Sequence, residues 1–291
     1  VETMTGLRQS LLHRAIALLA PFAVLVNPTA LARGEEQLSV PNPHWGAFFS
    51  GKDQRVAIEP TAWPWQAIGR VNVADRLVRR HCTGTLVGAR LVLTAGHCLY
   101  DHRVGGWAAP DRVHFVAGQA RDTWAGHSTA TEIIVPRDLD IANGTDPALG
   151  TIRGELMTHD WALIVLQTAL PIKPVPVKAI PPRAFAQEVA AGELARAGYG
   201  SDRPYLLSVH RGCAAALSDR WPGAMMNRCD QTPGDAGSPL LLLEGTQVAF
   251  VVGLSAAPAY EKRAEADYVA LAAFGPSATS FADAVVRALQ H

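Results

Sequence analysis

Two sets of short strand-like runs, separated by a proline-rich connector, constrain the fold of this chain more than any other feature. The runs are rich in Val, Leu, Ile and Thr and have turn residues between them. The connector, residues 171–182, has five prolines in twelve positions. Such a segment is disfavoured in the middle of a sheet, because proline has no N–H to donate to a neighbouring strand. The pattern therefore predicts two β modules joined by an extended linker.

The boundaries of these parts follow from the same pattern. The runs lie at 83–87, 91–95, 113–117, 131–135 and 161–166, and then at 193–199, 205–209, 239–243, 247–255 and 268–274. The expected parts are a first module at 56–170, a second at 183–276 and a helix at 277–291. The helix is indicated by apolar residues at helical spacing after Ser280, a candidate N-cap.

The composition supports an all-β class and excludes two kinds of partner. Among 291 residues, 26 basic side chains balance 26 acidic ones, so neither nucleic acid nor an anionic membrane surface is expected as the partner. The chain has 25 glycines, 20 prolines and only 7% aromatic residues, and this composition is typical of short strands joined by turns.

Residues 1–32 have the three regions of a secretory signal. Arg8 and Arg14 flank a polar start, an apolar run follows at 15–26, and residues 30–32 form a small-x-small cleavage site. The apolar run has 12 residues, whereas a bilayer-spanning helix needs about 20. We therefore expect loss of residues 1–32, an irregular leader at 33–55, and a secreted or periplasmic protein with no membrane contact after processing.

The four cysteines agree with an oxidising compartment. Cys82 and Cys98 are 16 residues apart, and so are Cys213 and Cys229. Three connectivities are open, and we expect the two local pairs, each of which would stabilise the fold by about 3 kcal/mol on a chain-entropy basis. Zinc binding is the alternative, but the chain has neither a C-x-x-C pair nor an H-E-x-x-H helix, so neither a metal nor another cofactor is expected.

Two residues are candidates for acid–base chemistry. His97 ends a strand-like run beside Cys98, and an imidazole can accept and return a proton near neutral pH. Asp160 opens the apolar run at 161–166, and if it faces His97 it would fix the tautomer and stabilise the imidazolium. Taken singly, His97 could equally be a packed histidine, and Asp160 could be a strand-end aspartate that binds nearby backbone amides.

A third stretch, Gly-Asp-Ala-Gly at 234–237, precedes another apolar strand and arranges successive backbone N–H groups on one concave surface. Taken together, LTAGHC, DWALIVL and GDAGSP resemble the chymotrypsin/trypsin-like serine endopeptidases, and AWPWQAIGRV is similar to the bacterial glutamyl-endopeptidase branch. The resemblance covers about residues 56–291. It implies an all-β fold of two six-stranded antiparallel β-barrels with a C-terminal α-helix.

The resemblance also implies roles for individual residues. His97 matches the general base, Asp160 the orienting carboxylate, and the amides of Gly234 and Ala236 the oxyanion hole. The family has serine where this chain has Ala236, and a methyl group has no oxygen to attack a carbonyl. Ser238 lies two residues further, about 6 to 7 Å along an extended chain, and cannot substitute.

We therefore expect a nearly inert protein, with two hypotheses for its origin and use. One is a protease silenced by a Ser→Ala change, and the other is a natural pseudoprotease that keeps the cleft for binding peptides or proteins. Both predict a monomer whose partner is a protein or peptide substrate.

Activation and substrate choice are also suggested by the resemblance. Cleavage of a zymogen after Arg55 would expose Val56, whose ammonium group would pair with Asp235 and order the oxyanion turn. Asp230 would select Arg or Lys at the pocket floor, although the position of Cys229 leaves open that Asp230 lies on the surface. The expected substrate-binding residues are Asp230, Gln231, Ser255, Ala256 and Ala257.

Ser255 has a second possible role, a hydrogen bond to Asp160. Ala256 and Ala257 would offer an open edge for pairing with an extended peptide.

Overall fold

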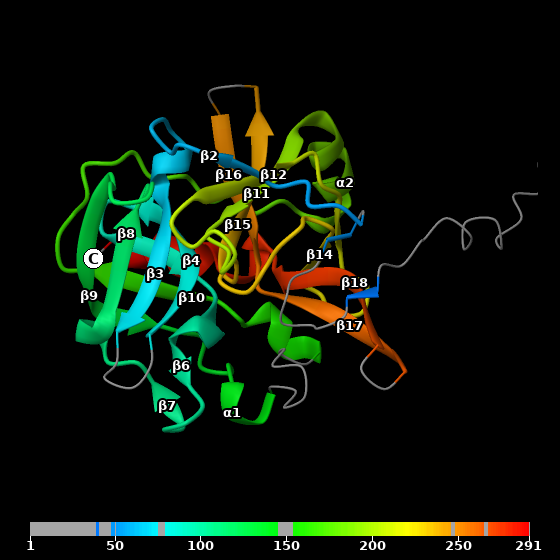
Figure 1. Ribbon diagram of the computed structural model, residues 1–291, viewed down its shortest axis with the longest axis horizontal. Coiled ribbons are helices and arrows are strands. Elements are labelled where there is room, and N and C mark those ends of the chain that lie inside the picture. The colour runs from blue at the N-terminus through cyan, green and yellow to red at the C-terminus, as the bar shows by residue number, and fades with distance from the viewer. Residues whose placement is uncertain are drawn as a thin grey trace, which may run out of the picture. The chain divides into compact units, whose positions relative to one another are not determined.

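The computed structural model describes residues 39–40, 48–49, 51–74, 79–144, 154–245, 248–264 and 267–290. The expected signal at 1–32 and most of the leader at 33–55 lie outside this range. The described part is mostly β, and its strands form one closed barrel, two five-stranded sheets and one two-stranded ribbon. This arrangement confirms the all-β class (Figure 1).

The first half of the described chain is the closed six-stranded barrel. Its strands pair in the order β10-β5-β4-β3-β8-β9 and are all antiparallel to their neighbours. Along β8, alternate residues are buried, so Val113, Phe115 and Ala117 fill the interior. The strands are β3 (Ile68–Ala74), β4 (Arg79–Gly88), β5 (Leu91–Thr94), β8 (Val113–Ala117), β9 (Gly126–Ile134) and β10 (Ala162–Leu166).

The second half forms two sheets, each of which is joined by one short strand from the N-terminal segment. One has the order β16-β15-β11-β12-β2, and the other has β1-β18-β14-β13 with β17 paired to β18. Their strands are β1 (Ser39–Val40), β2 (Val56–Ile58), β11 (Glu193–Gly198), β12 (Leu207–Arg211), β13 (Ala215–Leu217), β14 (Ala224–Asn227), β15 (Ser238–Glu244), β16 (Val248–Ser255), β17 (Ala257–Ala264) and β18 (Asp267–Pro276). The ribbon pairs β6 (Tyr100–Asp101) with β7 (Gly106–Trp107).

This half differs in detail from the single six-stranded barrel expected from sequence. The two sheets meet through isolated contacts rather than a continuous ladder: Gly253 bridges Ser277, and the Ala256 amide donates to the Phe274 carbonyl at 2.9 Å. At Gly275 an added Cβ would lie 2.0 Å from the Leu254 carbonyl oxygen, so the backbones of β16 and β18 are in close contact.

Three α-helices are described: α1 (Ile141–Gly144), α2 (Pro182–Ala191) and α3 (Ala282–Ala288). The predicted C-terminal helix is α3. The expected cap is wrong, because the Ser280 hydroxyl donates to the Gly223 carbonyl at 3.0 Å and Phe281 precedes the first turn. Helix α2, after the connector, was not predicted. Short 3₁₀ turns lie at Trp65–Ala67, Gly96–Leu99, Pro110–Arg112, Gly154–Thr158 and Ala278–Ser280.

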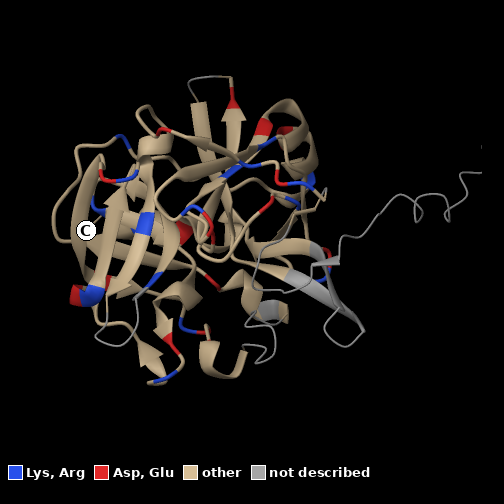
Figure 2. Ribbon diagram, viewed as in Figure 1, with Lys and Arg blue, Asp and Glu red and all other residues tan. Residues whose placement is uncertain are grey.

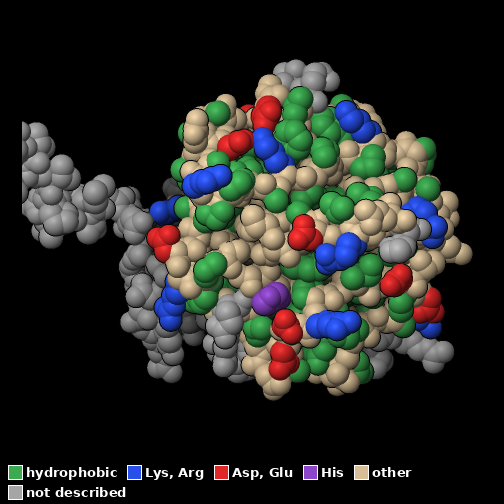
Figure 3. Space-filling view, turned by 180° about the vertical axis from the view of Figure 1, so that it is seen from behind, with side chains coloured by type: hydrophobic (Ala, Val, Ile, Leu, Met, Phe, Trp, Pro, Cys, Tyr) green, Lys and Arg blue, Asp and Glu red, His purple; other side chains and the backbone are tan. Residues whose placement is uncertain are grey.

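Both predicted disulfides are present, Cys82–Cys98 and Cys213–Cys229, with Cα separations of 6.1 and 5.1 Å. Basic and acidic side chains are interspersed along the described ribbon (Figure 2). The face in Figure 3 likewise carries both signs among apolar side chains. In the portion of the chain that is described, no helix combines the length and apolarity needed to cross a membrane.

Candidate active site

His97 lies in a 3₁₀ turn directly after strand β5. The turn is fixed by the Cys98–Cys82 disulfide to strand β4. Gly96 allows close packing here, since an added Cβ would lie 2.4 Å from Leu139 Cδ2 and 3.4 Å from Asp160 Oδ1. The turn therefore holds His97 at the end of the barrel, next to Asp160.

One carboxylate orients His97 through two contacts. Asp160 Oδ1 accepts the His97 backbone N–H at 2.8 Å, and Oδ2 lies 2.7 Å from His97 Nδ1. The Asp160 side chain is 1% exposed and that of His97 is 25% exposed, so the carboxylate is buried while the imidazole reaches solvent. The structure thus brings together the two residues that sequence analysis paired as base and orienting acid.

The same carboxylate changes the acidity of the imidazole. Burial alone would lower the pKa of His97, but the charge and hydrogen bond of Asp160 outweigh it, so the pKa of His97 is raised. The positive charge of Arg80 opposes this increase. His97 Nε2 has no oxygen or nitrogen partner among the described residues; it lies 3.9 Å from Cys98 Sγ.

The turn that contains Ala236 leaves two backbone donors unused. The amides of Asp235, Gly237 and Ser238 each donate to a backbone carbonyl oxygen within 3.0 Å. Those of Gly234 and Ala236 donate to no partner among the described residues. Gly234 has a φ of +96°, and an added Cβ would lie 2.5 Å from His81 Nε2, so the turn requires glycine there.

Ala236 lies close to His97. Its carbonyl oxygen is 3.8 Å from Cys98 Sγ, the same sulfur atom that lies 3.9 Å from His97 Nε2. The site therefore combines an oriented imidazole with two amides that have no partner among the described residues, and residue 236 contributes only a methyl group. This combination could polarise a carbonyl group and transfer a proton, but it holds no side-chain nucleophile at residue 236.

A buried threonine of the barrel holds this turn in place. Thr83 Oγ1 donates to the Gly234 carbonyl at 3.0 Å and accepts the Tyr199 amide at 2.9 Å. The Thr83 amide donates to the Ala236 carbonyl at 2.9 Å. Sequence analysis missed Thr83, because nothing in its local sequence distinguishes it from the other threonines of strand β4.

Asp235 lies behind the turn between two buried arginines. Its Oδ1 is 2.7 Å from Arg196 Nη1, and its Oδ2 is 3.4 Å from Arg55 Nη1. All three side chains are at most 1% exposed. The Thr232 amide adds a hydrogen bond of 2.8 Å to Oδ2. Asp235 therefore has its counter-charges before any cleavage of the chain.

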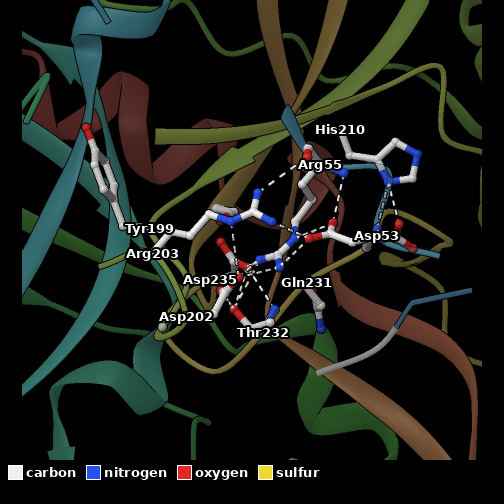
Figure 4. Close-up of polar contacts among 12 residues, drawn as sticks. Asp53, Arg55, Tyr199, Asp202, Arg203, His210, Gln231, Thr232 and Asp235 are labelled. Carbon is white, nitrogen blue, oxygen red and sulfur yellow. Dashed lines mark hydrogen bonds and ion pairs between the residues drawn. The ribbon is translucent and has the colours of Figure 1, made fainter. Parts of the chain in front are cut away.

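Arg55 connects this ion pair to the N-terminal segment (Figure 4). It contacts Asp53 at 2.9 Å and Asp202 at 2.7 Å, and Arg203 reaches Asp53 at 2.8 Å. Burial alone would lower the pKa of Arg55, but hydrogen bonds to Asp53 and Asp202 and the charge of Asp235 raise it. Burial would raise the pKa values of Asp53 and Asp202, but Arg55 holds both below their ordinary range.

The structure differs from the activation pairing that sequence analysis expected. Val56 is 63% exposed and lies in β2, where it pairs with Val209 of β12. Arg196 and Arg55, not a main-chain ammonium group, lie beside Asp235. The sequence did contain a signal for this, since Arg196 interrupts the apolar run at 193–199.

Asp230 also differs from its expected place on the pocket floor. It is 0% exposed, and its carboxylate accepts the backbone amides of Phe49 at 2.9 Å and Gln54 at 2.8 Å. Its own amide donates to His210 Nδ1 at 2.9 Å. Asp230 thus anchors the N-terminal segment; it is buried and not on the surface, and its carboxylate already accepts two backbone amides.

The other expected substrate-binding residues lie near the turn. The Ser255 hydroxyl donates to Gln231 Oε1 at 2.5 Å, and not to Asp160. The Ser255 carbonyl accepts the Gly237 amide, which joins strand β16 to the turn. Ala256 and Ala257 pair on one side with Phe274 of β18. The opposite edge of β17 has no strand partner among the residues that the structure covers.

Comparisons with known proteins agree with this geometry. The profile of the trypsin-like peptidase domain matches residues 82–254, more than half of the chain. Serine protease 23 of Rattus norvegicus is 30% identical over 165 residues, which cover 54% of this chain but only 42% of that protein. The chain thus spans less than half the length of these curated relatives. Glutamyl endopeptidase of Bacillus licheniformis is 39% identical over 59 residues, 20% of this chain and 17% of that protein.

Solved structures show the same fold. A Glu endopeptidase structure superimposes with a TM-score of 0.62 at 20% identity, covering 83% of this chain and 99% of that one. The protease Anisep from Arthrobacter nicotinovorans gives a TM-score of 0.56 at 18% identity, covering 79% and 98%.

Proposed function

Because the chain belongs to the trypsin-like peptidase family, we propose that its cleft binds extended segments of proteins and that residue 236 decides whether a bound segment is cleaved. With alanine there, the bound segment stays intact. The observation that carries the proposal is the 2.7 Å contact between His97 Nδ1 and Asp160 Oδ2 next to the unused amides of Gly234 and Ala236.

The serine form, Ala236→Ser, would have the parts needed for acyl transfer. The new Oγ would attack the scissile carbonyl while His97 Nε2 takes its proton, and Asp160 would stabilise the resulting imidazolium. The amides of Gly234 and residue 236 would hold the oxyanion. His97 would then protonate the leaving amine, and water would hydrolyse the acyl-enzyme by the same steps in reverse order.

The alanine form lacks the first of these steps. Removal of the serine from such a triad lowers turnover by about a millionfold and leaves about 10³- to 10⁴-fold acceleration over water from the remaining donors. Peptide binding needs no hydroxyl, and it is supported by the strand edge of β17 that lacks a partner among the described strands.

Hydrolysis by the revertant tests the proposal. Ala236→Ser is assayed against a set of tetrapeptide p-nitroanilides and thioesters that differ only in the residue before the scissile bond. We expect turnover at least about 10³-fold above that of the alanine form, inhibition by an organophosphonate, and loss of both in the His97→Ala double variant. A folded revertant with no hydrolysis of any member of the set would overturn the proposal.

Because Asp230 is buried, we propose that the pocket is uncharged, or that it binds a substrate side chain through hydrogen-bond acceptors of that side chain. We do not expect a preference for basic substrate residues. The Asp230 carboxylate is already bonded to two backbone amides. The same substrate set tests this, and a preference for Arg or Lys above all other residues would contradict it.

The two disulfides and the signal-like sequence at 1–32 support export from the cytoplasm, which we include in the proposal together with a monomeric state. N-terminal sequencing of protein recovered from the periplasm or medium, and light scattering of that material, test both points. Retention of residues 1–32 in a cytoplasmic fraction would contradict export.

A further inference from the structure

We propose that the Ala236 site is a receptor for the free C-terminal carboxylate of a peptide. The inference rests on the proposed peptide-binding function and adds a ligand class to it. Three hydrogen-bond donors could bind a carboxylate. They are the amides of Gly234 and Ala236, which have no partner among the described residues, and Nε2 of His97. A carboxylate can accept from all three at once.

The argument begins with the number of acceptor oxygens. The carbonyl of an uncut peptide brings one oxygen, which can occupy the two amides and leaves His97 Nε2 without an acceptor. A terminal carboxylate brings two oxygens on the same carbon, so one can accept from the amides while the other accepts from Nε2. Hydrogen bonds between ionised partners are roughly twice as strong as neutral ones.

The missing hydroxyl makes room for the second oxygen. In the serine form, Oγ lies between residue 236 and the imidazole and takes the Nε2 hydrogen bond itself. Ala236 has only a methyl group, and both Ala236 and His97 lie within 4 Å of the same sulfur, Cys98 Sγ. In this chain a ligand oxygen would accept the Nε2 hydrogen bond that Oγ takes in the serine form.

The charges around His97 favour this ligand under mildly acidic conditions. Asp160 holds Nδ1 and favours the imidazolium, while Arg80 places a second positive charge within electrostatic range. An imidazolium carries hydrogen on both nitrogens, so Nε2 donates to the ligand while Nδ1 donates to Asp160. Binding of a carboxylate thus takes up a proton at His97, and affinity increases as the pH falls.

The rest of the peptide has a strand edge to follow. Ser255, Ala256 and Ala257 leave the turn and enter β17, whose edge opposite β18 has no partner among the described strands. An extended peptide can add its backbone to that edge and end with its carboxylate at Ala236. The site therefore fits the last few residues of a chain, such as the product of an earlier cleavage.

Matched peptide pairs test the inference. Fluorescein-labelled tetrapeptides Ala-Ala-Pro-X, with X as Glu, Leu, Ala or Lys, are titrated as free acids and as C-terminal amides by fluorescence anisotropy between pH 5.5 and 8.5. We expect at least one free acid to bind about tenfold tighter than its amide at the acidic end, with the ratio falling as pH rises.

Two variants separate this site from unspecific peptide binding. Ala236→Ser should reduce the acid-to-amide ratio to about one, and His97→Gln should remove the pH dependence of that ratio. Equal binding of acid and amide at every pH would overturn the inference, even if Ala236→Ser hydrolyses substrates. If the alanine form prefers the free acid but the Ala236→Ser revertant hydrolyses no substrate, the inference stands and the proposed role of residue 236 in cleavage is overturned.

Discussion

Asp235 and Arg196 form an ion pair inside the protein, with 2.7 Å between Oδ1 and Nη1 and with side chains that are 1% and 0% exposed. Asp235 belongs to the turn that carries Ala236, whereas Arg196 lies in strand β11. The pair therefore ties the turn to a five-stranded sheet and holds it in the uncut chain.

Removal of the cation should destabilise the whole domain. In Arg196→Met the carboxylate of Asp235 stays buried, and among the described residues it keeps Arg55, 3.4 Å away, as its one paired cation. Loss of one partner from a buried pair costs about 3 to 5 kcal/mol, and urea unfolding followed by circular dichroism measures it. The matched control is Arg211→Gln, whose side chain is 53% exposed and whose loss should cost under about 1 kcal/mol. Equal effects of the two changes would contradict a role for the buried pair.

Thr83→Val tests the hydroxyl that holds the turn. The change keeps the shape of the side chain but leaves the Tyr199 amide and the Gly234 carbonyl without their partner. Each unsatisfied buried group costs about 1 to 3 kcal/mol, so we expect a clear loss in the free energy of unfolding. In the Ala236→Ser background it should also lower kcat.

The control for Thr83 lies two residues along the same strand. Thr85 is equally buried, yet its hydroxyl has no hydrogen-bond partner in the described structure. Thr85→Val should therefore leave stability unchanged or raise it by up to about 1 kcal/mol. A Thr83→Val protein as stable as Thr85→Val would show that the two hydrogen bonds contribute nothing net.

The pH profile of the Ala236→Ser enzyme should reveal the contact between His97 and Asp160. A general base must be neutral, so activity falls as pH drops through the pKa of His97, which lies above the ordinary value of about 6.5. Asp160→Asn removes the charge that raises this pKa. We expect the acidic midpoint of kcat/KM to move to lower pH and the rate to fall about 10⁴-fold. Asp111→Asn, a change at a carboxylate that is 76% exposed, should alter neither quantity.

Cleavage after Arg55 should impair the serine form. Arg55 reaches Asp53, Asp202 and Asp235 at once, so a cut between Arg55 and Val56 frees this segment from β2. We expect full-length Ala236→Ser to be active without the cut, and Arg55→Gln to lower both its melting temperature and its kcat. Arg203→Gln, at a half-exposed arginine that contacts Asp53 but has no contact with Asp235 in the structure, should do so less. An increase in activity on cleavage would restore the zymogen hypothesis.

The sequence contained the parts of the site that occur as contiguous motifs. His97, Asp160 and the Gly234 turn each stand next to an apolar run, so their strand-end positions follow from the order of residues along the chain. The local disulfides followed from the equal spacing of the two cysteine pairs, and the closed first barrel followed from the resemblance to the chymotrypsin/trypsin-like family. What the sequence could not supply was the direction in which a loop side chain points.

Asp230 illustrates this limit. The resemblance suggested a place for Asp230 at the pocket floor, but its carboxylate accepts the amides of Phe49 and Gln54, almost two hundred residues earlier. The contacts of Thr83 with Gly234 and of Arg55 with Asp202 were not predicted, because the partners in each pair are more than a hundred positions apart. The close approach of Gly275 to the Leu254 carbonyl oxygen brings residues of two different sheets together, and strand propensity contains no information about such a contact.

The single hydroxyl of Thr83 has a consequence for chimeras of this protein. It belongs to the first barrel, yet it bonds to Tyr199 and Gly234 in the second half. If either half is exchanged for that of a homologue, the turn is preserved only if the chimera still has a side chain that can form both of these hydrogen bonds. Recombination between relatives should therefore succeed when Thr83 and the segments that contain Tyr199 and Gly234 all come from one parent.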